Sequence, residues 1–497
     1  MSKFFKRSLL AVSVASGLVM ASTAHATHGM NMDSYGAIAG GMGGAAMASN
    51  VGNSAVMNNP ATLGMNKDGN VIGLGYTLMA PRVWAETPQG MRSDSKGRWY
   101  HMPSASYIRT QGQFSFGAAV MAQGGMGTDY GSGSAAFAGG CAASTMTMGQ
   151  CVPTMMSGQD IRSELSVGRM MFPLAYKVND KVSLAAQLDV VWAGLDLRMD
   201  IDGNTFGMMA FPDGGTPGVG SASGSMVDGF KMMMGQGAIE DVNYARFDFS
   251  NDSRFTGDAS SAGLGGKLGI VVQPTDRVTL GATYHMKTNL GDMKTGGANV
   301  SFAGTGAFFD QMLPPEAGGV ATLTGDIRIR DFQWPETFAV GIAVQATDRL
   351  RLAADIKRLN WSKVMDTFDM SFTAANTPAN GSFAGAQMDA SLDQDWDDQT
   401  VFAIGGAYQL NDQWIVRAGA NFSSNPIPDG TVNPLFPAIT EQHYSAGFTY
   451  RINPRSALHG AITYAPRVTV TNTGPSLNGM KMSHAQTLLR VNYGYRF

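Results

Sequence analysis

Charged residues are scarce in this chain of 497 residues. Asp, Glu, Lys and Arg together make up 15% of it, whereas a soluble domain carries about 25%. The deficit fits a protein with one face turned toward lipid, where charge is costly. Because the formal net charge is only −3, the composition gives no electrostatic footprint for nucleic acid.

Long apolar runs are absent as well. No stretch after residue 26 reaches the roughly eighteen apolar residues that a transmembrane helix needs. This argues against a helical membrane protein but leaves a membrane β-barrel open, since barrel strands are short and half polar. The first 26 residues read as a signal peptide, with a basic start, an apolar stretch over 9–20 and a cleavage site at Ala24-His25-Ala26.

Cysteine and catalytic motifs are equally sparse. Cys141 and Cys151 are the only cysteines, and in an exported protein such a close pair predicts a disulfide rather than a metal site. The seven histidines show no H-E-x-x-H spacing, and no serine lies in G-x-S-x-G. We therefore expect no catalytic residue, cofactor or metal, although a Ser–His pair remains open. The aspartates between 393 and 398 could bind Ca²⁺, but a solvated loop is the simpler interpretation.

What the chain does contain is a series of alternating strands joined in pairs by short polar turns. Asn, Asp and Gly suit tight hairpins, and the connections between the hairpins are long. Short turns at one end and long loops at the other are typical of outer-membrane barrels. The turns are Gln111-Gly112, Asn179-Asp180, Thr275-Asp276, Thr347-Asp348, Asn411-Asp412 and Asn453-Pro454.

The alternation has a period of two residues, so each strand has one apolar face. Leu184, Leu188 and Trp192 fall on one face, and Ser183 and Asp189 fall on the other. A soluble sandwich could show the same pattern. The number and spacing of the strands favour an all-β transmembrane antiparallel barrel.

The chain ends in a strand that terminates at Phe497. It resembles the final strand of bacterial outer-membrane proteins, which implies recognition by the barrel-assembly machinery. Counting gives about 14 strands, an even number as such barrels require. The predicted strands cover 72–85, 98–110, 112–123, 164–178, 181–198, 255–274, 277–290, 324–346, 349–361, 397–410, 413–422, 441–452, 456–470 and 481–497.

Three regions follow from this pattern: a signal peptide at 1–26, an N-terminal hatch or plug at 27–69, and the barrel at 70–497. The hatch contains small residues and the turn-forming Asn59-Pro60-Ala61. Residues 41–46 match a loose dinucleotide pattern, but the strand that this motif needs does not precede them.

These elements resemble the FadL family of outer-membrane porins for long-chain fatty acids and other hydrophobic compounds. The resemblance covers nearly all of the chain apart from the long loops. It is carried by an ordered set of motifs: the Gly-rich stretch 34–48, Asn59-Pro60-Ala61, Trp334-Pro335-Glu336-Thr337, Asn360-Trp361-Ser362, Trp396-Asp397-Asp398-Gln399, Trp414-Ile415-Val416-Arg417-Ala418-Gly419 and Asn425-Pro426-Ile427-Pro428.

The resemblance implies a barrel of fourteen strands closed by an internal hatch. It also implies passive uptake, with the ligand captured by outer loops, bound inside and released sideways at a kink in the third strand. The matching kink is at Gly124, Gly125 and Gly127, and glycine inside a strand marks a bulge or bend. The alternative is that these glycines simply begin the next loop.

Apolar residues gather in two of the long loops, as binding surfaces often do. The resemblance makes these loops the capture groove, although the side chains could instead pack only against one another. The residues are Phe206, Met208, Met209, Phe211, Phe230, Met233, Phe308, Phe309, Met312 and Leu313.

Arg198 is the candidate partner for a fatty acid carboxylate. The lysine that the family has before the tenth strand is replaced by Asp397-Asp398, so neutral aromatics or alkanes remain open as ligands. A general porin, which segment 27–69 argues against, and an adhesive surface protein are the other classes. We expect a monomer in the outer membrane, in contact with lipid and lipopolysaccharide, with both termini in the periplasm.

Overall fold

The computed structural model describes residues 28–137, 141–147, 150–153, 156–212, 214–252, 257–313 and 317–497. For 141–147 and 150–153 it describes the backbone alone. The predicted signal peptide lies outside these residues, and so do the side chains of Cys141 and Cys151. The disulfide therefore stays a prediction.

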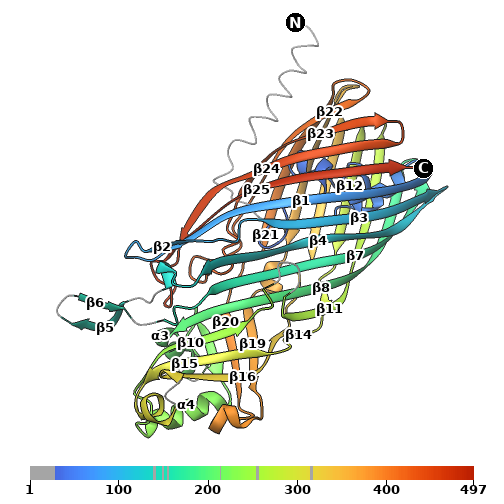
Figure 1. Cartoon of the computed structure of the whole chain (residues 1–497). Helices are drawn as coiled ribbons and strands as arrows, with labels where there is room; N and C mark the ends of the chain where they lie inside the picture. The colour runs from blue at the N-terminus through green and yellow to red at the C-terminus, as the bar shows by residue number, and fades with distance from the viewer. Residues whose placement is uncertain are drawn as a thin grey trace.

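The barrel is a closed antiparallel ring in which each strand pairs with the next and the last, β25, pairs with the first, β1 (Figure 1). Closure leaves no unpaired edge, as a sheet in lipid requires. Within the described residues the ring has fourteen strands: β1 (Gly69–Glu86), β3 (Tyr100–Gln111), β4 (Phe114–Gly131), β7 (Ile161–Asn179), β8 (Val182–Asp202), β11 (Ala259–Thr275), β12 (Val278–His285), β17 (Thr337–Gln345), β18 (Leu350–Leu359), β21 (Gln399–Gln409), β22 (Trp414–Ser423), β23 (Gln442–Asn453), β24 (Ser456–Thr471) and β25 (Lys481–Arg496).

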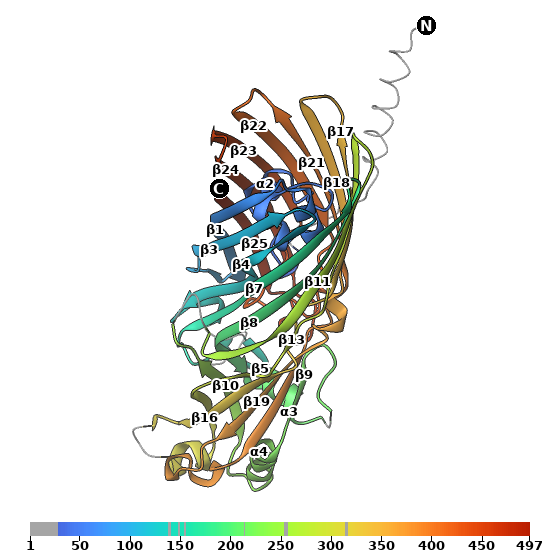
Figure 2. The same cartoon turned by 90° about the vertical axis from the view of Figure 1, so that its right-hand side faces the viewer.

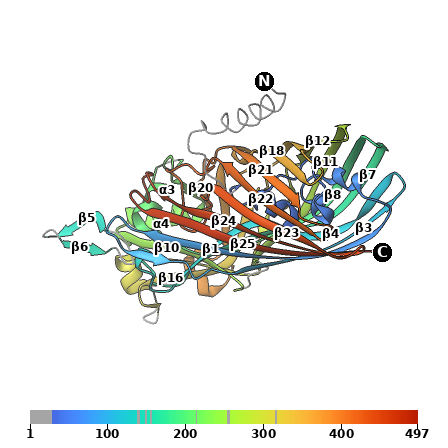
Figure 3. The ribbon, with the colours of Figure 1, turned by 90° about the horizontal axis from the view of Figure 1, so that it is seen from above.

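All six predicted hairpins are confirmed, because each short turn joins two paired strands. The turns lie at one end of the ring, which we call the short-turn end. There Phe497 also meets the start of β1, with its backbone N–H donating to the Asn70 carbonyl at 3.0 Å. Figure 3 shows this C-terminal end opposite the end that carries the long loops.

The sheet as a whole contains 23 strands, so the prediction of about 14 strands in the chain is too low. The long loops supply the others, and the predicted strand 324–346 is in fact two strands separated by a break. The loop strands are β2 (Arg92–Asp94), β9 (Gly220–Ser223), β10 (Asp241–Phe249), β13 (Asn289–Leu290), β14 (Met293–Lys294), β15 (Ala298–Thr305), β16 (Val320–Arg330), β19 (Thr367–Ala374) and β20 (Gln387–Asp393).

Six of these strands build a lobe beyond the ring. The lobe begins where β8 changes partner: residues 182–195 pair with β11, whereas 197–202 pair with β10. From β10 the pairing continues through β15, β16, β19 and β20 to β9 (Figure 1). The helical pieces of the long loops are α3 (Gly203–Ala210), α4 (Ser225–Gly235), η3 (Ala135–Phe137), η4 (Phe308–Met312), η6 (Trp361–Lys363) and η7 (Pro378–Phe383). A separate two-stranded sheet pairs β5 (Cys141–Thr147) with β6 (Gln150–Pro153).

The two faces of the ring differ in chemistry. On β8, Leu184, Leu188 and Trp192 are exposed on the outside, and Ser183 and Asp189 are buried inside. This is the alternation that the sequence predicted, with apolar side chains outward. In the part of the chain that the structure describes, no helix is long and apolar enough to cross a membrane.

The N-terminal segment, residues 28–66, lies inside the ring (Figure 2). It is folded into α2 (Ala37–Gly41), η1 (Gly52–Val56) and η2 (Pro60–Met65). Asn59 caps η2, since its Oδ1 accepts from Ala61 N at 3.1 Å, and Pro60 is the first residue of the turn. The Asn59 amide also donates to the carbonyls of Met47 and Ile270 at 2.8 and 3.1 Å, which fixes η2 to β11.

Polar side chains of the wall hold the segment through its backbone. Asp355 on β18 accepts from the backbone N–H groups of Ala46 and Met47 at 2.6 and 3.0 Å. The guanidinium of Arg490, on β25, forms a fully buried ion pair with Asp33. These bonds satisfy groups that burial would otherwise leave unpaired.

Glycines of the wall let the segment approach closely. A Cβ at Gly405 would lie 2.3 Å from the Met42 carbonyl oxygen. The neighbouring Gly406 points to the other face, where a Cβ would find Leu352 Cδ2 at 3.4 Å. Because successive residues of a strand alternate between faces, this pair provides a matched test of the contact.

We expect Gly405→Ala to loosen the N-terminal segment, because the new Cβ would force apart two backbones at a cost of about 1–3 kcal/mol. Hydrogen–deuterium exchange read by mass spectrometry should then be roughly tenfold faster over residues 37–48, as about 1.4 kcal/mol implies. Gly406→Ala should leave that exchange at the parent rate. Equal exchange in the two variants would contradict the contact.

Candidate functional site

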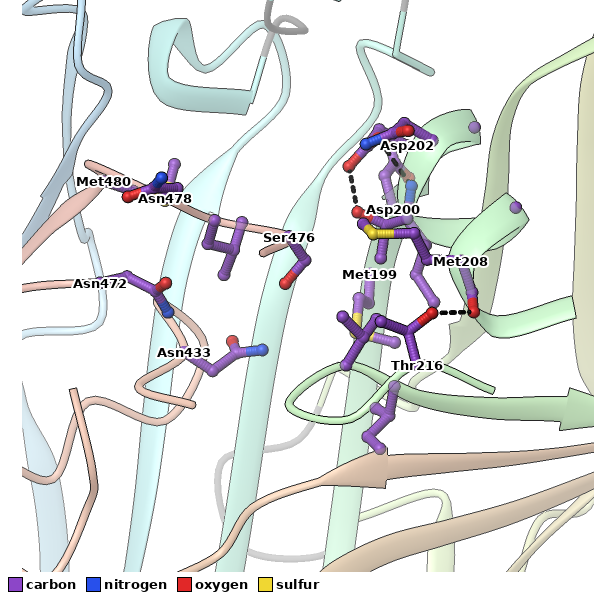
Figure 4. Close-up of a pocket in the computed structure, with 18 of the residues that line it drawn as sticks. Met199, Asp200, Asp202, Met208, Thr216, Asn433, Asn472, Ser476, Asn478 and Met480 are labelled. Carbon is purple, nitrogen blue, oxygen red and sulfur yellow. Dashed lines mark hydrogen bonds between the residues drawn. The ribbon is translucent and has the colours of Figure 1, made fainter. Parts of the chain in front are cut away.

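A large cavity opens among the long loops, and we call it the loop-end cavity. Its volume is about 1200 Å³. Figure 4 shows Asn433, Asn472 and Ser476 on one side of it, facing Met199 and Met208 on the other. Four aspartates line the cavity, and among the described residues that line it there is neither lysine nor arginine: the aspartates are Asp200, Asp202, Asp241 and Asp393.

The apolar loop residues predicted to capture ligand divide into two groups. Met208 and Phe211 line the loop-end cavity, as the sequence analysis expected of a binding surface. Most of the others are buried inside the lobe, where Phe230 stacks on Phe383 at a centroid distance of 5.3 Å. The buried set is Phe206, Met209, Phe230, Phe308 and Phe309; Met233 and Leu313 are half-buried, and Met312 is exposed.

Both interpretations of these loops therefore have support, each for different residues. The aromatic side chains form a core that orders the lobe, while only part of the set faces the cavity. Met234, which the sequence analysis did not select, also lines the cavity. Sequence composition cannot separate the two groups, because that depends on how α3 and α4 pack.

A second cavity, the wall cavity, lies where the ring is incompletely paired. β3 and β4 pair from Gln111↔Phe114 up to Ala105↔Val120 and no further. Beyond that point β3 still pairs with β1 and β4 still pairs with β7, but β3 and β4 no longer pair with each other. The cavity occupies this opening with a volume of about 330 Å³.

The lining of the wall cavity is largely apolar. It comes from the N-terminal segment, from strands β1, β3, β4, β7, β8 and β25, and from Ala438, and the described residues that line it include no lysine or arginine. Glu164 is its one acidic residue, and it is paired with Arg162 at 2.9 Å. The apolar side chains are Met30, Met32, Met79, Met102, Val120, Met121, Met126, Leu165, Val167 and Trp192.

Gly124, Gly125 and Gly127 all line the wall cavity. The register of β4 against β7 shifts between Ala122 and Gly124, which is the irregularity that the glycines predicted. Gly125 has φ +151°, and a Cβ there would lie 2.1 Å from the Leu165 carbonyl oxygen. The glycines therefore belong to the strand, and the alternative that they begin a loop is wrong.

The N-terminal segment pairs with β4 where β3 does not. Asn31 forms an antiparallel bridge with Gly124, and the backbone N–H of Gly125 donates to the Met30 carbonyl at 2.9 Å. A Cβ at Gly124 would lie 2.2 Å from that carbonyl oxygen. The glycine is thus required for the segment to reach the strand.

Three buried tryptophans lie beside this contact. Trp334 packs on Trp361, and Trp361 packs on Trp396, with centroid distances of 5.4 and 5.2 Å. The Trp334 Nε1–H donates to Asn31 Oδ1 at 3.2 Å. These three tryptophans belong to the motifs that carry the family resemblance, but no role was predicted for them. Their spacing in the sequence does not reveal that they meet.

Arg198 does not face either of the two cavities. It continues the outward alternation of Leu184 and Trp192 along β8, with no register shift between them. Its guanidinium is held by three aspartates, Asp160 at 3.0 Å, Asp248 at 3.2 Å and Asp252 at 3.1 Å. A ligand carboxylate would have to displace these partners, so the structure argues against the role predicted for Arg198.

Several buried cations of the barrel interior are ion-paired, whereas Lys357 donates to the Gly44 carbonyl at 3.1 Å. Arg169 and Lys267 both contact Asp189, at 2.7 and 2.6 Å. Buried charges are stable only when they are paired in this way. Among the described residues no group of three or more His, Cys, Asp or Glu side chains is arranged to hold a metal ion.

A family profile described as "Outer membrane protein transport protein (OMPP1/FadL/TodX)" matches residues 17–497. The fold is similar to the crystal structure of the Pseudomonas putida toluene transporter TodX, at 28% identity and a TM-score of 0.74, over 94% of this chain and 99% of that one. It is also similar to the Ralstonia pickettii toluene transporter TbuX, at 26% identity and a TM-score of 0.67, over 94% of this chain and 99% of that one.

A curated relative from Chlorobium limicola is called an uncharacterized protein in the phosphoenolpyruvate carboxykinase gene 5' region. It is 51% identical over 67 residues, which is 13% of this chain and 33% of the relative. The chain thus spans about a third of the length of that relative. Because the family profile covers nearly the whole chain, the protein belongs to the OMPP1/FadL/TodX family of outer-membrane transport proteins.

Proposed function

We propose that this protein carries small neutral hydrophobic molecules, such as monoaromatic hydrocarbons, passively across the outer membrane. The ligand enters the loop-end cavity, passes to the wall cavity and leaves sideways between β3 and β4. The N-terminal segment acts as the hatch that prevents a direct path to the short-turn end. In this arrangement the long loops are extracellular and both termini are periplasmic.

The observation that carries the choice of ligand is the charge of the two linings. Neither cavity has a lysine or arginine among its described lining residues, and the loop-end cavity has four aspartates. An anionic ligand would meet repulsion at the entrance and would lose its water without a cationic partner. A neutral ligand avoids both costs.

The relatives support the same class of ligand. TodX and TbuX, which are more than a quarter identical to this chain, are both named as toluene transporters. A long-chain fatty acid, the ligand that the sequence analysis favoured, belongs to the same family of functions but has no matching cation here. The wall cavity is at the small end of the 300–1,000 Å³ range of ligand pockets.

The sideways exit follows from the solubility of such a ligand. Each buried CH₂ stabilises it by about 0.8 kcal/mol relative to water, so release into the periplasm is less favourable than release into the bilayer. The unpaired stretch between β3 and β4 offers a route that crosses no closed ladder. Contact with lipid, lipopolysaccharide and the barrel-assembly machinery, and a monomeric state, remain predictions that accompany this function.

The first test compares ligands. Cells that depend on this protein for uptake should take up radiolabelled toluene faster than control cells with the empty vector, and an excess of oleate should compete poorly. The physical reason is the acidic, cation-free lining of the loop-end cavity. Saturable oleate uptake that toluene does not reduce would contradict a neutral ligand and would favour a fatty acid as the ligand instead.

The second test closes the opening in the wall. Ala122 lies on β4 at the opening and lines the wall cavity, whereas Ala118 is four residues away on the same strand, where it pairs with Tyr107 of β3. Ala122→Trp should fill the opening and lower the initial rate of toluene uptake about tenfold, as a barrier increase of about 1.4 kcal/mol implies.

Ala118→Trp is the matched control and should leave the rate unchanged. Heat-modifiable gel mobility should show both variants folded. Substitution of Gly124 or Gly125 is a poorer test, because a side chain there would collide with the Met30 or Leu165 carbonyl. If Ala122→Trp transports at the parent rate, the sideways route at this position is wrong.

The third test concerns the hatch. A protein that lacks residues 27–60 should still fold, because the strands of the ring close on one another without the segment. Its conductance in planar bilayers should rise well above that of the intact protein, because the lumen is no longer filled. A folded deletion variant that conducts no better than the intact protein would show that the segment does not close the barrel.

A further inference from the structure

The two cavities share no lining residue in the described chain, although several elements contribute to both. β7 contributes Ile161 to the loop-end cavity and Glu164 to the wall cavity. In the region of β25, Met480 lines the loop-end cavity and His484 lines the wall cavity. Three residues of strand span about 10 Å, so a partition of roughly that thickness separates the cavities.

Another shared element is the loop 424–441, which joins β22 to β23. Leu435 lines the loop-end cavity, and Ala438 lines the wall cavity. Both side chains are buried, at 3% and 2% exposure. Since β7 and β25 belong to the wall of the ring, this loop is the shared element that is not itself a wall strand.

Hydroxyl groups of β4 and β7 hold the loop by its carbonyl oxygens. Leu435 O accepts from Thr128 Oγ1 at 3.2 Å and from Ser163 Oγ at 2.5 Å. The Tyr130 hydroxyl donates to the Pro434 carbonyl at 2.8 Å. Thr128 and Ser163 adjoin Gly127 and Glu164, which line the wall cavity, so Leu435 lies at the level where one cavity ends and the other begins.

We propose that loop 424–441 is the constriction between the two cavities and that Leu435 is the residue that sets the width of ligand allowed through it. The inference rests on the proposed function, because it assumes that ligand passes from one cavity to the other. An apolar side chain at this position suits a neutral ligand, which gains nothing from polar groups during passage. The prolines at 426, 428, 434 and 437 stiffen the loop, because each fixes its own φ.

The test changes the size of residue 435 in both directions and measures initial uptake of radiolabelled toluene and of the wider naphthalene by cells. Leu435→Trp should lower uptake of both solutes about tenfold, equivalent to a barrier increase of about 1.4 kcal/mol. Leu435→Ala should raise the ratio of naphthalene to toluene uptake by about the same factor. Leu323 is buried to a similar degree, at 4% exposure, but lines neither cavity, so Leu323→Trp and Leu323→Ala are the matched controls and should change neither quantity.

A folded Leu435→Trp variant that transports at the parent rate would overturn the proposal, and so would Leu323 variants with effects as large as those at Leu435. If Leu435→Trp does not fold, the Leu435→Ala ratio decides alone, and an unchanged ratio rejects the constriction. Failure of the sideways exit is recognised separately, because Ala122→Trp would then have no effect while the Leu435 variants still changed uptake.

Discussion

The structure depends on one constraint: a sheet in lipid must pair its backbone N–H and C=O groups with one another, because no water is available to replace a missing partner. The ring meets this by closing β25 on β1 over sixteen residues of each strand, from Val71↔Arg496 to Glu86↔Lys481. The separation of β3 from β4 breaks the same rule locally. The break is tolerated because the N-terminal segment supplies part of the missing ladder from inside, at Met30 and Asn31.

This pairing links the N-terminal segment to the opening. The residues that pair with β4 are anchored to the tryptophan cluster through Asn31 and Trp334 and to β25 through Asp33 and Arg490. Glycine at 124 lets the two backbones meet, and glycine at 405 does the same for Met42 farther along the segment. The segment is therefore fitted to the wall by close backbone contacts and buried polar bonds in addition to apolar packing, since Met57 and Leu63 of the segment belong to one buried apolar cluster with wall residues such as Met171.

The strands of the ring could be predicted from the sequence, because the patterns that identify them are local. Period-two alternation identifies a strand, and two polar residues between strands identify a hairpin, so all six short-turn hairpins were found. The loop strands were missed for the opposite reason: β16 pairs with β19 across more than forty residues without a turn signal that links them. The break between β16 and β17 was missed too, because both strands are apolar enough to read as one.

The site residues show the same difference between local patterns, which the sequence reveals, and contacts between distant loops, which it does not. The kink at Gly124, Gly125 and Gly127 could be predicted because glycine in a strand has a local meaning. The role predicted for Arg198 is disfavoured by information already in the sequence, since the outward alternation from Leu184 to Trp192 extends to residue 198. The meeting of Trp334, Trp361 and Trp396, and the position of Leu435, depend on how distant loops fold together, which no local pattern specifies.

The distribution of charge inside the barrel bears on the kind of ligand that the protein can accept. Inside the ring, Arg169 and Lys267 share the carboxylate of Asp189, and Arg490 is paired with Asp33. Each cation is tied to the architecture, and none is among the described residues that line the two cavities. Polar groups therefore hold the wall and the N-terminal segment together, while the spaces open to a ligand are lined by apolar and polar side chains together with acidic ones, Glu164 in the wall cavity and four aspartates in the loop-end cavity. Such a division favours a ligand that is recognised by size and apolar contact, because the described residues that line the two cavities include no lysine or arginine to bind an anion.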